Sequence, residues 1–356
     1  MGNVSKTVFL LCVCFAITAC STVDETRKFD FIADKNDLKQ TWPYGNEIAR
    51  YLYLGDITGE NNLTAIKQKN ESTLGKLWQF IIGEFEDEPV VLKRPQSIVG
   101  DELGRLFITD ISNQSVFVFD TVNGTMEQWP NAKQHYDFVS PVAVALGVNN
   151  EILVADSVLG KVFRLDSTGK PIGIIEHSSL IRPTGIVRVA QENKIYVSDT
   201  VSDNIKVFSD QGELLETLGK SGNGNGEFNG PTYLAKHPQG ILVADTLAAR
   251  VQLIANANGK VEYIRTLGER GLQIGDLMRP KGVAADSAGN IYIVESYFDH
   301  LLIYNSNGEF LMPLGGTGFS PGEFYLPAGI WIDAKDRVFI ADMMNGRVSV
   351  FQFLGD

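Results

Sequence analysis

Cations next to proline are the residues of this sequence whose type and spacing best suit a binding site. Arginine immediately precedes proline at three positions, Arg94, Arg182 and Arg279, and a lysine, Lys281, follows one of these prolines. Guanidinium groups bind carboxylates and phosphates through paired hydrogen bonds, and an ammonium group adds a compact charge. Brought together, the four side chains would bind a carboxylate, a phosphate or an acidic protein segment. The alternative is that each arginine pairs with a nearby acid, such as Glu84, Asp276 or Glu323.

Signals for catalysis are weaker. The four histidines, His135, His177, His237 and His300, are scattered along the chain, whereas a zinc site needs ligands that converge on one point. Neither a Gly-x-Ser-x-Gly nor a His-Glu-x-x-His motif occurs. We therefore predict no catalytic residue, no metal ligand and no cofactor, with a calcium or zinc ion on a central axis as the open alternative.

The elements that position these residues form a repeat. Its opening proline recurs six times in steps of 46, 42, 48, 49 and 47 residues, at Pro95, Pro141, Pro183, Pro231, Pro280 and Pro327. An acid follows an apolar triplet in every unit, at Asp110, Asp156, Asp199, Asp245, Glu295 and Asp342. About four short strands fit into each unit, which is the content of a propeller blade. We predict an all-β, six-bladed propeller in which these acids hold backbone amides in turns.

Two aromatic residues break the repeat where the innermost strands would meet. The second residue after each proline is small except at Tyr233, and two positions further on the residue is Val or Ala except at Trp331. Function in a repeat protein tends to lie where one copy differs from the others. Both rings either plug the axis as core or form a ligand site at the channel mouth, together with the four cations.

The two ends of the repeat are complementary. The sixth unit is one strand short at the C-terminus, and a strand-like segment from Ala49 to Leu54 precedes the first complete unit. We predict that this segment completes the last blade beside residues 348–353, leaving no open edge. An insertion at about 60–84 follows, and its helical spacing aligns four apolar residues, Leu74, Leu77, Trp78 and Ile81. This helix either packs on the propeller or docks a partner.

The N-terminus has the pattern of a lipoprotein leader. An apolar run from Val8 to Ile17 is too short to span a bilayer, but it suits a signal peptide. It ends in Ile17-Thr18-Ala19-Cys20, which resembles a bacterial lipobox and implies that Cys20 is acylated. We expect a signal peptide at 1–19, a polar tether at 20–47 and the propeller at 48–356. Ser21 favours the outer membrane, facing the periplasm or the cell surface. An ordinary secretory signal is the alternative.

The repeat itself resembles a known family. The phrase from Pro280 to Tyr304 and the glycine-rich junctions, such as Leu267-Gly268, are similar to NHL repeats, and six copies extend from Arg94 to the C-terminus. The whole chain resembles a group of bacterial lipoproteins built as six-bladed NHL propellers. NHL relatives bind proteins or RNA in some cases and carry metal-dependent lyase chemistry in others, so the resemblance implies fold and location.

Composition narrows the choice of partner. The net charge of −12 argues against nucleic acid and against anionic lipid. All three cysteines, Cys12, Cys14 and Cys20, lie in the first twenty residues, so no disulfide framework holds the repeats. We predict a lipid-anchored, non-enzymatic binding or scaffolding platform for an envelope protein or an anionic ligand. A metal-assisted lyase or lactonase acting at the axial channel is the alternative.

Overall fold

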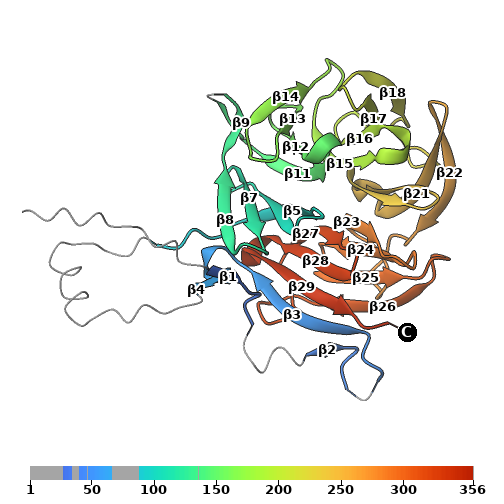
Figure 1. The fold of residues 1–356 in the computed structure, drawn as a ribbon. Coiled ribbons are helices and arrows are strands. Elements are labelled where there is room, and N and C mark those ends of the chain that lie inside the picture. The colour runs from blue at the N-terminus through green and yellow to red at the C-terminus, as the bar shows by residue number, and fades with distance from the viewer. Residues whose placement is uncertain (1–26, 34–39, 46, 66–87, 135, 356) are drawn as a thin grey trace, which may run out of the picture.

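The protein folds as a six-bladed β-propeller (Figure 1). The computed structural model describes residues 27–33, 40–45, 47–65, 88–134 and 136–355. Five blades are four-stranded sheets, and the sixth has five strands. Helical structure in these ranges is limited to short 3-10 turns, of which the first is Glu60–Asn62. The predicted propeller is confirmed, whereas most of the predicted helical insertion, with Leu74, Leu77, Trp78 and Ile81, lies outside the described residues.

Each blade begins at its proline with the innermost strand. Blade 1 comprises β5 (Pro95–Gly100), β6 (Arg105–Asp110), β7 (Ser115–Asp120) and β8 (Thr125–Trp129). Blade 2 comprises β11 (Pro141–Leu146), β12 (Ile152–Asp156), β13 (Lys161–Leu165) and β14 (Pro171–Ile175). Blade 3 comprises β15 (Pro183–Val189), β16 (Lys194–Asp199), β17 (Asn204–Ser209) and β18 (Leu214–Leu218). Blade 4 comprises β19 (Pro231–His237), β20 (Gly240–Asp245), β21 (Arg250–Ala257) and β22 (Lys260–Leu267). Blade 5 comprises β23 (Pro280–Ala285), β24 (Ile291–Glu295), β25 (His300–Tyr304) and β26 (Phe310–Gly315).

Blade 6 joins the two ends of the chain. It comprises β27 (Pro327–Ile332), β28 (Arg337–Asp342), β29 (Arg347–Phe353) and β3 (Tyr51–Ile57), with β2 (Thr41–Trp42) at its outer edge. Strand β3 runs antiparallel to β29, so that Ile57 lies opposite Val348. The prediction that an N-terminal strand completes the last blade is therefore confirmed.

The core lies between the blades. The second strand of each blade is almost wholly buried, because both of its faces pack against apolar side chains of neighbouring blades. The inner strands approach one another so closely at the axis that only small residues fit. A side chain on Gly185 would overlap the carbonyl of Thr232, and one on Gly329 would overlap that of Gln96. Glycine is required there for close backbone approach.

The propeller has two distinct faces. We call the end of the axis where the inner strands begin the proline face; it also carries the junction loops between blades and the turns between second and third strands. The opposite face carries the remaining turns. The recurring acids hold the proline face together: Asp110 accepts hydrogen bonds from the backbone N–H groups of Lys93 and Arg94 at 2.6 and 2.9 Å. The carboxylates of Asp156, Asp199 and Glu295 each accept from two backbone N–H groups in the same way, which confirms their predicted structural role.

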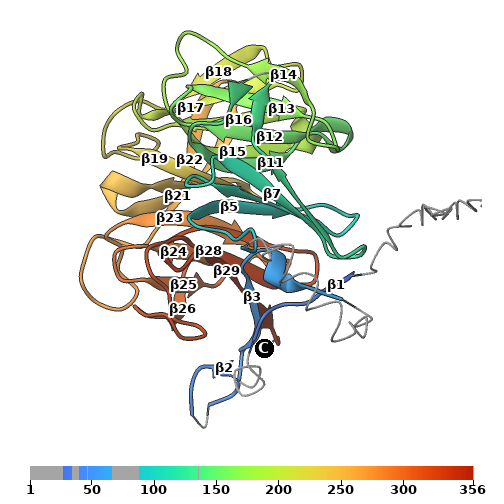
Figure 2. The same ribbon diagram turned by 90° about the vertical axis from the view of Figure 1, so that its left-hand side faces the viewer.

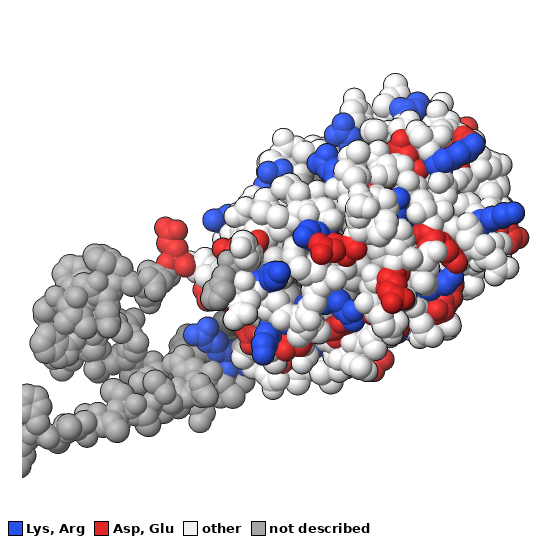
Figure 3. All heavy atoms as spheres, turned by 90° about the horizontal axis from the view of Figure 1, so that it is seen from above, with Lys and Arg blue, Asp and Glu red and all other residues white. Residues whose placement is uncertain are grey.

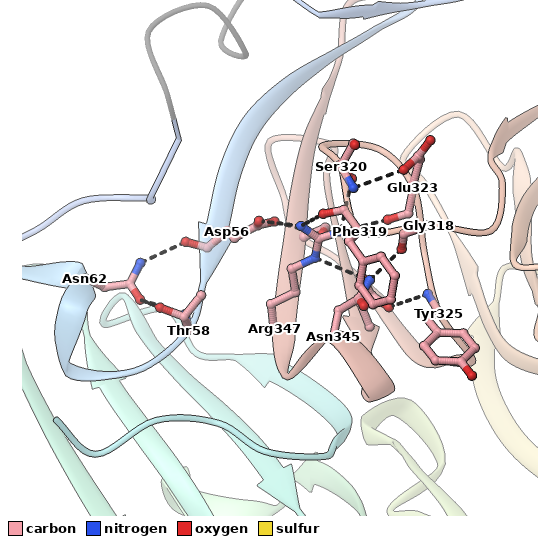
Figure 4. A network of polar contacts seen from close by, with 12 residues as sticks. Asp56, Thr58, Asn62, Gly318, Phe319, Ser320, Glu323, Tyr325, Asn345 and Arg347 are labelled. Atoms are coloured by element: carbon pink, nitrogen blue, oxygen red, sulfur yellow. Dashed lines mark hydrogen bonds and ion pairs between the residues drawn. The ribbon is translucent and has the colours of Figure 1, made fainter. Parts of the chain in front are cut away.

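A buried arginine links the closing strand to the last blade (Figure 4). Arg347 in β29 donates to the carboxylate of Asp56 in β3 at 3.0 Å and to that of Asp342 in β28 at 2.9 Å. Its other N–H groups donate to three carbonyls of one junction loop, those of Phe319, Ser320 and Glu323. All five guanidinium donors are thus used. Ring closure therefore rests on strand pairing together with this network.

The prediction of a polar tether over residues 20–47 is wrong for part of that stretch. Strand β1 (Arg27–Phe29) pairs with β4 (Leu63–Ala65) (Figure 1), and β2 pairs with β3 (Figure 2). Phe29 and Trp42 are 8% and 3% exposed, and they pack on Phe119 and Phe351. These contacts join residues far apart in the chain, so the polar composition and absent periodicity of the stretch could not reveal them.

Candidate functional site on the proline face

The three arginines that precede prolines share one face of the propeller. Arg94, Arg182 and Arg279 each come directly before an inner strand, in blades 1, 3 and 5, and all three are exposed. Lys281 is the second residue of β23 in blade 5 and is half-buried. The structure therefore places the four predicted cations around the proline end of the axis; we call them the basic ring.

The backbone under this ring is held firmly. The N–H groups of Arg94, Arg182 and Arg279 each donate to the acid of their own blade, at about the same distance of 2.9 to 3.0 Å. The guanidinium groups are not used by these bonds. The chain thus presents each arginine from a fixed position while its charged end faces solvent.

The expected local pairing of these arginines is not found. Within the described ranges, none of the four cations has an ion pair with a carboxylate, and the two expected partners are engaged in their own loops. Asp276 accepts from the N–H of Gln273 at 2.8 Å, and Glu323 accepts from that of Ser320 at 3.0 Å. The third expected partner, Glu84, lies outside the described residues.

The charges of the ring act on one another. Burial lowers the pKa of Lys281, and the positive charges of Arg279 and Arg94 lower the pKa further. Arg94 belongs to blade 1 and Lys281 to blade 5, with blade 6 between them. Their electrostatic coupling agrees with a shared location at the end of the axis, where an anion would relieve the repulsion.

Cations on the opposite face are arranged differently. Four arginines there form ion pairs of 2.7 to 2.8 Å with acids: Arg105 with Asp101, Arg164 with Glu151, Arg188 with Asp210 and Arg337 with Asp333. On the side of the molecule drawn in Figure 3, positive and negative side chains are interspersed. The cations of the basic ring therefore differ from these four arginines, because no ion pair joins them to an acid in the described ranges.

Tyr233 crosses the axis and closes the channel. From β19 in blade 4 its hydroxyl donates to the main-chain carbonyl of Gln96 in blade 1 at 2.8 Å. Burial raises the pKa of Tyr233, so the hydroxyl keeps its proton. The side chain thus acts as a hydrogen-bonded plug between the basic ring and the rest of the channel.

Trp331 lies on the other side of this plug. It lines an axial cavity of about 330 Å³ together with residues of all six inner strands. Its ring is 5.0 Å from that of Phe339, and it lies directly over Gly100. Tyr233 lines the same cavity, so the two aromatic residues that break the repeat share one axial cavity, and the four cations lie toward the proline end of the axis.

The histidines do not converge in the described part of the chain. His177 is exposed and contacts Ser179, His237 is buried at the opposite end of β19, and His300 begins β25; His135 is outside the described residues. No group of three His, Cys, Asp or Glu side chains in the described ranges is placed to hold a metal ion.

No helix in these ranges is long and apolar enough to cross a membrane. Cys20 lies outside them.

Sequence reasoning missed a set of apolar side chains on the same face. Leu272, Ile274 and Phe319 are 75%, 71% and 74% exposed in the junction loops on either side of blade 5. The available signal was their position between the paired glycines of each junction, where the turn leaves little room for burial. The proline face therefore carries exposed apolar side chains as well as the basic ring.

Comparisons with known proteins agree on the architecture. A family described as "6-bladed beta-propeller" matches residues 280–355. Protein brain tumor of Drosophila melanogaster is 28% identical over 138 residues, which is 38% of this chain and only 12% of that protein's length. An auxiliary nutrient binding protein from Bacteroides ovatus superposes with a TM-score of 0.59 at 12% identity, covering 75% of this chain and 71% of that one. Virginiamycin B lyase from Staphylococcus aureus superposes with a TM-score of 0.52 at 12% identity, covering 74% of this chain and 96% of the lyase chain. With its six sheets around one axis, this chain is a six-bladed β-propeller.

Proposed function

We propose that this protein is a lipid-anchored, non-enzymatic binding propeller of the bacterial envelope that takes an anionic group at its basic ring. The observation that carries the proposal is the unpaired state of Arg94, Arg182, Arg279 and Lys281 on the described surface of a protein whose net charge is −12. Unpaired guanidinium groups held on a rigid frame are suited to bidentate binding of carboxylates or phosphates. Three of them on alternate blades match a ligand with several acidic groups.

The fold alone leaves the function open, because the proteins of similar structure include both a nutrient binding protein and a lyase. The placement of side chains supports binding. The described histidines lie at different places in the fold, whereas the cations gather at one end of the axis. Clustered arginine and lysine side chains without ion-pair partners are suited to binding an anion. Proton transfer would instead need a positioned acid or base.

The start of the fold supports an orientation for the proposed anchor. Arg27 at the beginning of β1 lies against Gly124 in the turn between β7 and β8, which belongs to the opposite face. The six residues between Cys20 and Arg27 can span about 20 Å when extended. An acyl group on Cys20 would therefore hold the opposite face near an outer membrane and direct the basic ring toward the periplasm or the medium.

Anion titration tests the proposal. Citrate and inorganic phosphate are titrated into the full acylated protein in detergent by calorimetry, and again into the triple variant with Arg94, Arg182 and Arg279 changed to alanine. Because these side chains are exposed, we expect the variant to keep its melting temperature and lose citrate binding. The control changes three exposed lysines of the opposite face, Lys170, Lys236 and Lys335, and should bind as the parent does. Absent binding in the parent, or equal binding in the triple variant, contradicts the proposal.

The pH dependence of citrate binding supplies a second readout. The pKa of Lys281 is lowered, so its positive charge disappears at a lower pH than that of an ordinary lysine. Binding should therefore weaken as the pH rises through this lowered pKa. Changing Lys281 to methionine should remove this decline, while the arginines keep their charge throughout.

A further inference from the structure

Exposed apolar side chains are spread over the loops of the proline face, including Val158, Val201 and Met344 in the turns of blades 2, 3 and 6, and six large ones lie in the loops around blade 5. These six form what we call the apolar crescent: Leu247, Leu272, Ile274, Tyr297, Phe319 and Tyr325, each between 39% and 75% exposed. They belong to the junction loops on both sides of blade 5 and to the turns of blades 4 and 5. Single exposed apolar residues are ordinary, but a group on one face marks an interaction surface.

Local contacts hold parts of this crescent in place. The guanidinium of Arg270 donates to the carbonyl of Leu247 at 2.6 Å, which joins the turn of blade 4 to the next junction loop. Leu272 and Ile274 line a small cavity of about 80 Å³ with Phe298, whose ring is 4.9 Å from that of Tyr297. Beyond blade 5, the rings of Phe319 and Tyr325 are 5.9 Å apart.

One buried acid connects the crescent to the basic ring. Glu295 accepts from the N–H of Tyr297 at 2.9 Å and from the N–H of Arg279 at 2.9 Å. One carboxylate thus fixes the backbone positions from which an apolar side chain and a cation of the basic ring extend. The proline face therefore offers charge and apolar surface to a single partner.

The crescent is rigid where Phe319 and Tyr325 lie (Figure 4). The carbonyl of Phe319 accepts from Arg347 at 3.1 Å, while the N–H of Tyr325 donates to Asp342 at 2.8 Å. Both partners are buried, so the loop that carries the two rings is fixed from below. An aromatic ring on a fixed backbone loses little freedom on binding, which is characteristic of the residues that dominate interfaces.

The charges select the chemistry of the partner. A second copy of this chain docked through the same face would bring basic ring against basic ring, and like charges in contact are costly. A bilayer is placed elsewhere by the proposed acylation of Cys20, because Arg27, seven residues further along the chain, lies at the opposite face. An acidic partner with apolar neighbours satisfies both surfaces.

We infer that the proline face docks a protein segment in which acidic residues are flanked by apolar ones. The acids occupy the basic ring, and the apolar residues cover the crescent around Phe319. This inference rests on the proposed function, since the same ring supplies the charge, and it adds the class of partner and the surface that recognises it.

Peptide selection tests the inference. A random 12-residue library displayed on phage is selected against the full acylated protein in detergent, and the enriched peptides are measured by fluorescence anisotropy. We expect Asp and Glu to be enriched together with Leu, Phe or Trp. Changing Leu272 and Phe319 to serine should weaken these peptides at least tenfold, because exposed anchors carry much of such an interface. The control changes Leu103 and Ile172, similarly exposed on the opposite face, to serine and should leave affinity unchanged.

The outcomes separate the two proposals. Peptides without acidic enrichment, or with equal affinity for the crescent variant, overturn the inference, and citrate binding that persists in that variant leaves the proposed function standing. If the parent protein does not bind citrate, both the inference and the proposed function are overturned. Flotation with phosphatidylglycerol vesicles provides the third comparison, since vesicle binding that depends on Leu272 and Phe319 would replace the protein partner with a bilayer.

Discussion

Replacing Arg347 with methionine should destabilise the propeller more than any change to its surface charges. The residue is 8% exposed, and its side chain donates to Asp56, to Asp342 and to three main-chain carbonyls. Methionine fills similar volume but leaves two buried carboxylates without their cation. Breaking a buried pair by removing one partner costs about 3–5 kcal/mol, so we expect a loss of that size in the free energy of unfolding.

Urea unfolding at pH 7, followed by tryptophan fluorescence and by circular dichroism, measures this loss. The matched control is Arg337→Met in the same blade, whose ion pair with Asp333 is more exposed and should be worth about 1 kcal/mol or less. Because Asp56 belongs to β3, the Arg347 variant should also release the N-terminal strand to protease before the other blades. A loss below about 1 kcal/mol, or equal losses for the two variants, would refute the reasoning.

Acid should partly rescue the Arg347 variant. Burial raises the pKa of Asp342 from 3.8 to about 6, and it also raises that of Asp56. A carboxyl whose pKa is higher in the folded state binds its proton more tightly there, so lowering the pH from 7 toward 5 favours folding. For Asp342 the whole shift corresponds to about 3 kcal/mol at 1.36 kcal/mol per unit, and it is reached in full only below pH 3.8. Without Arg347 both pKa values rise further, so the gap between variant and parent should narrow as the pH falls.

Two further predictions concern the axis and the anchor. Changing Tyr233 to phenylalanine leaves the carbonyl of Gln96 without its donor and should lower the free energy of unfolding by about 1 kcal/mol, measured by urea; an unchanged value would show that the hydroxyl does not bind across the axis. Changing Cys20 to serine should abolish incorporation of labelled palmitate in bacterial cells and move the protein from the membrane to the soluble fraction, whereas continued labelling would mean that Cys20 is not the acylated residue.

Much of the fold could be predicted because its signals are local. Each unit contains its own proline, its own alternating strands and its own acid, so six similar units could be recognised without knowing how they meet. The strand from Tyr51 to Ile57 could be assigned to the last blade because the sixth unit lacked one. By contrast, the packing of Phe29 and Trp42 depends on partners 90 and 309 residues away, Phe119 and Phe351, and left no periodic pattern.

The candidate site could likewise be predicted only in part from the sequence. Its residue types and their place before each proline were readable from the sequence, because the repeat assigns every Arg-Pro pair to an equivalent position. Whether Arg279 finds a carboxylate could not be read in this way, since Asp276 is used by its own loop. The contact of Tyr233 could not be read from the sequence either, because its hydroxyl binds a carbonyl 137 residues away along the chain. The sequence by itself determined the repeating blade and the residues at its ends, since these depend on neighbours along the chain. The tertiary structure decided which side chains meet across the axis and which stay unpaired, because only closure of the ring brings the blades together.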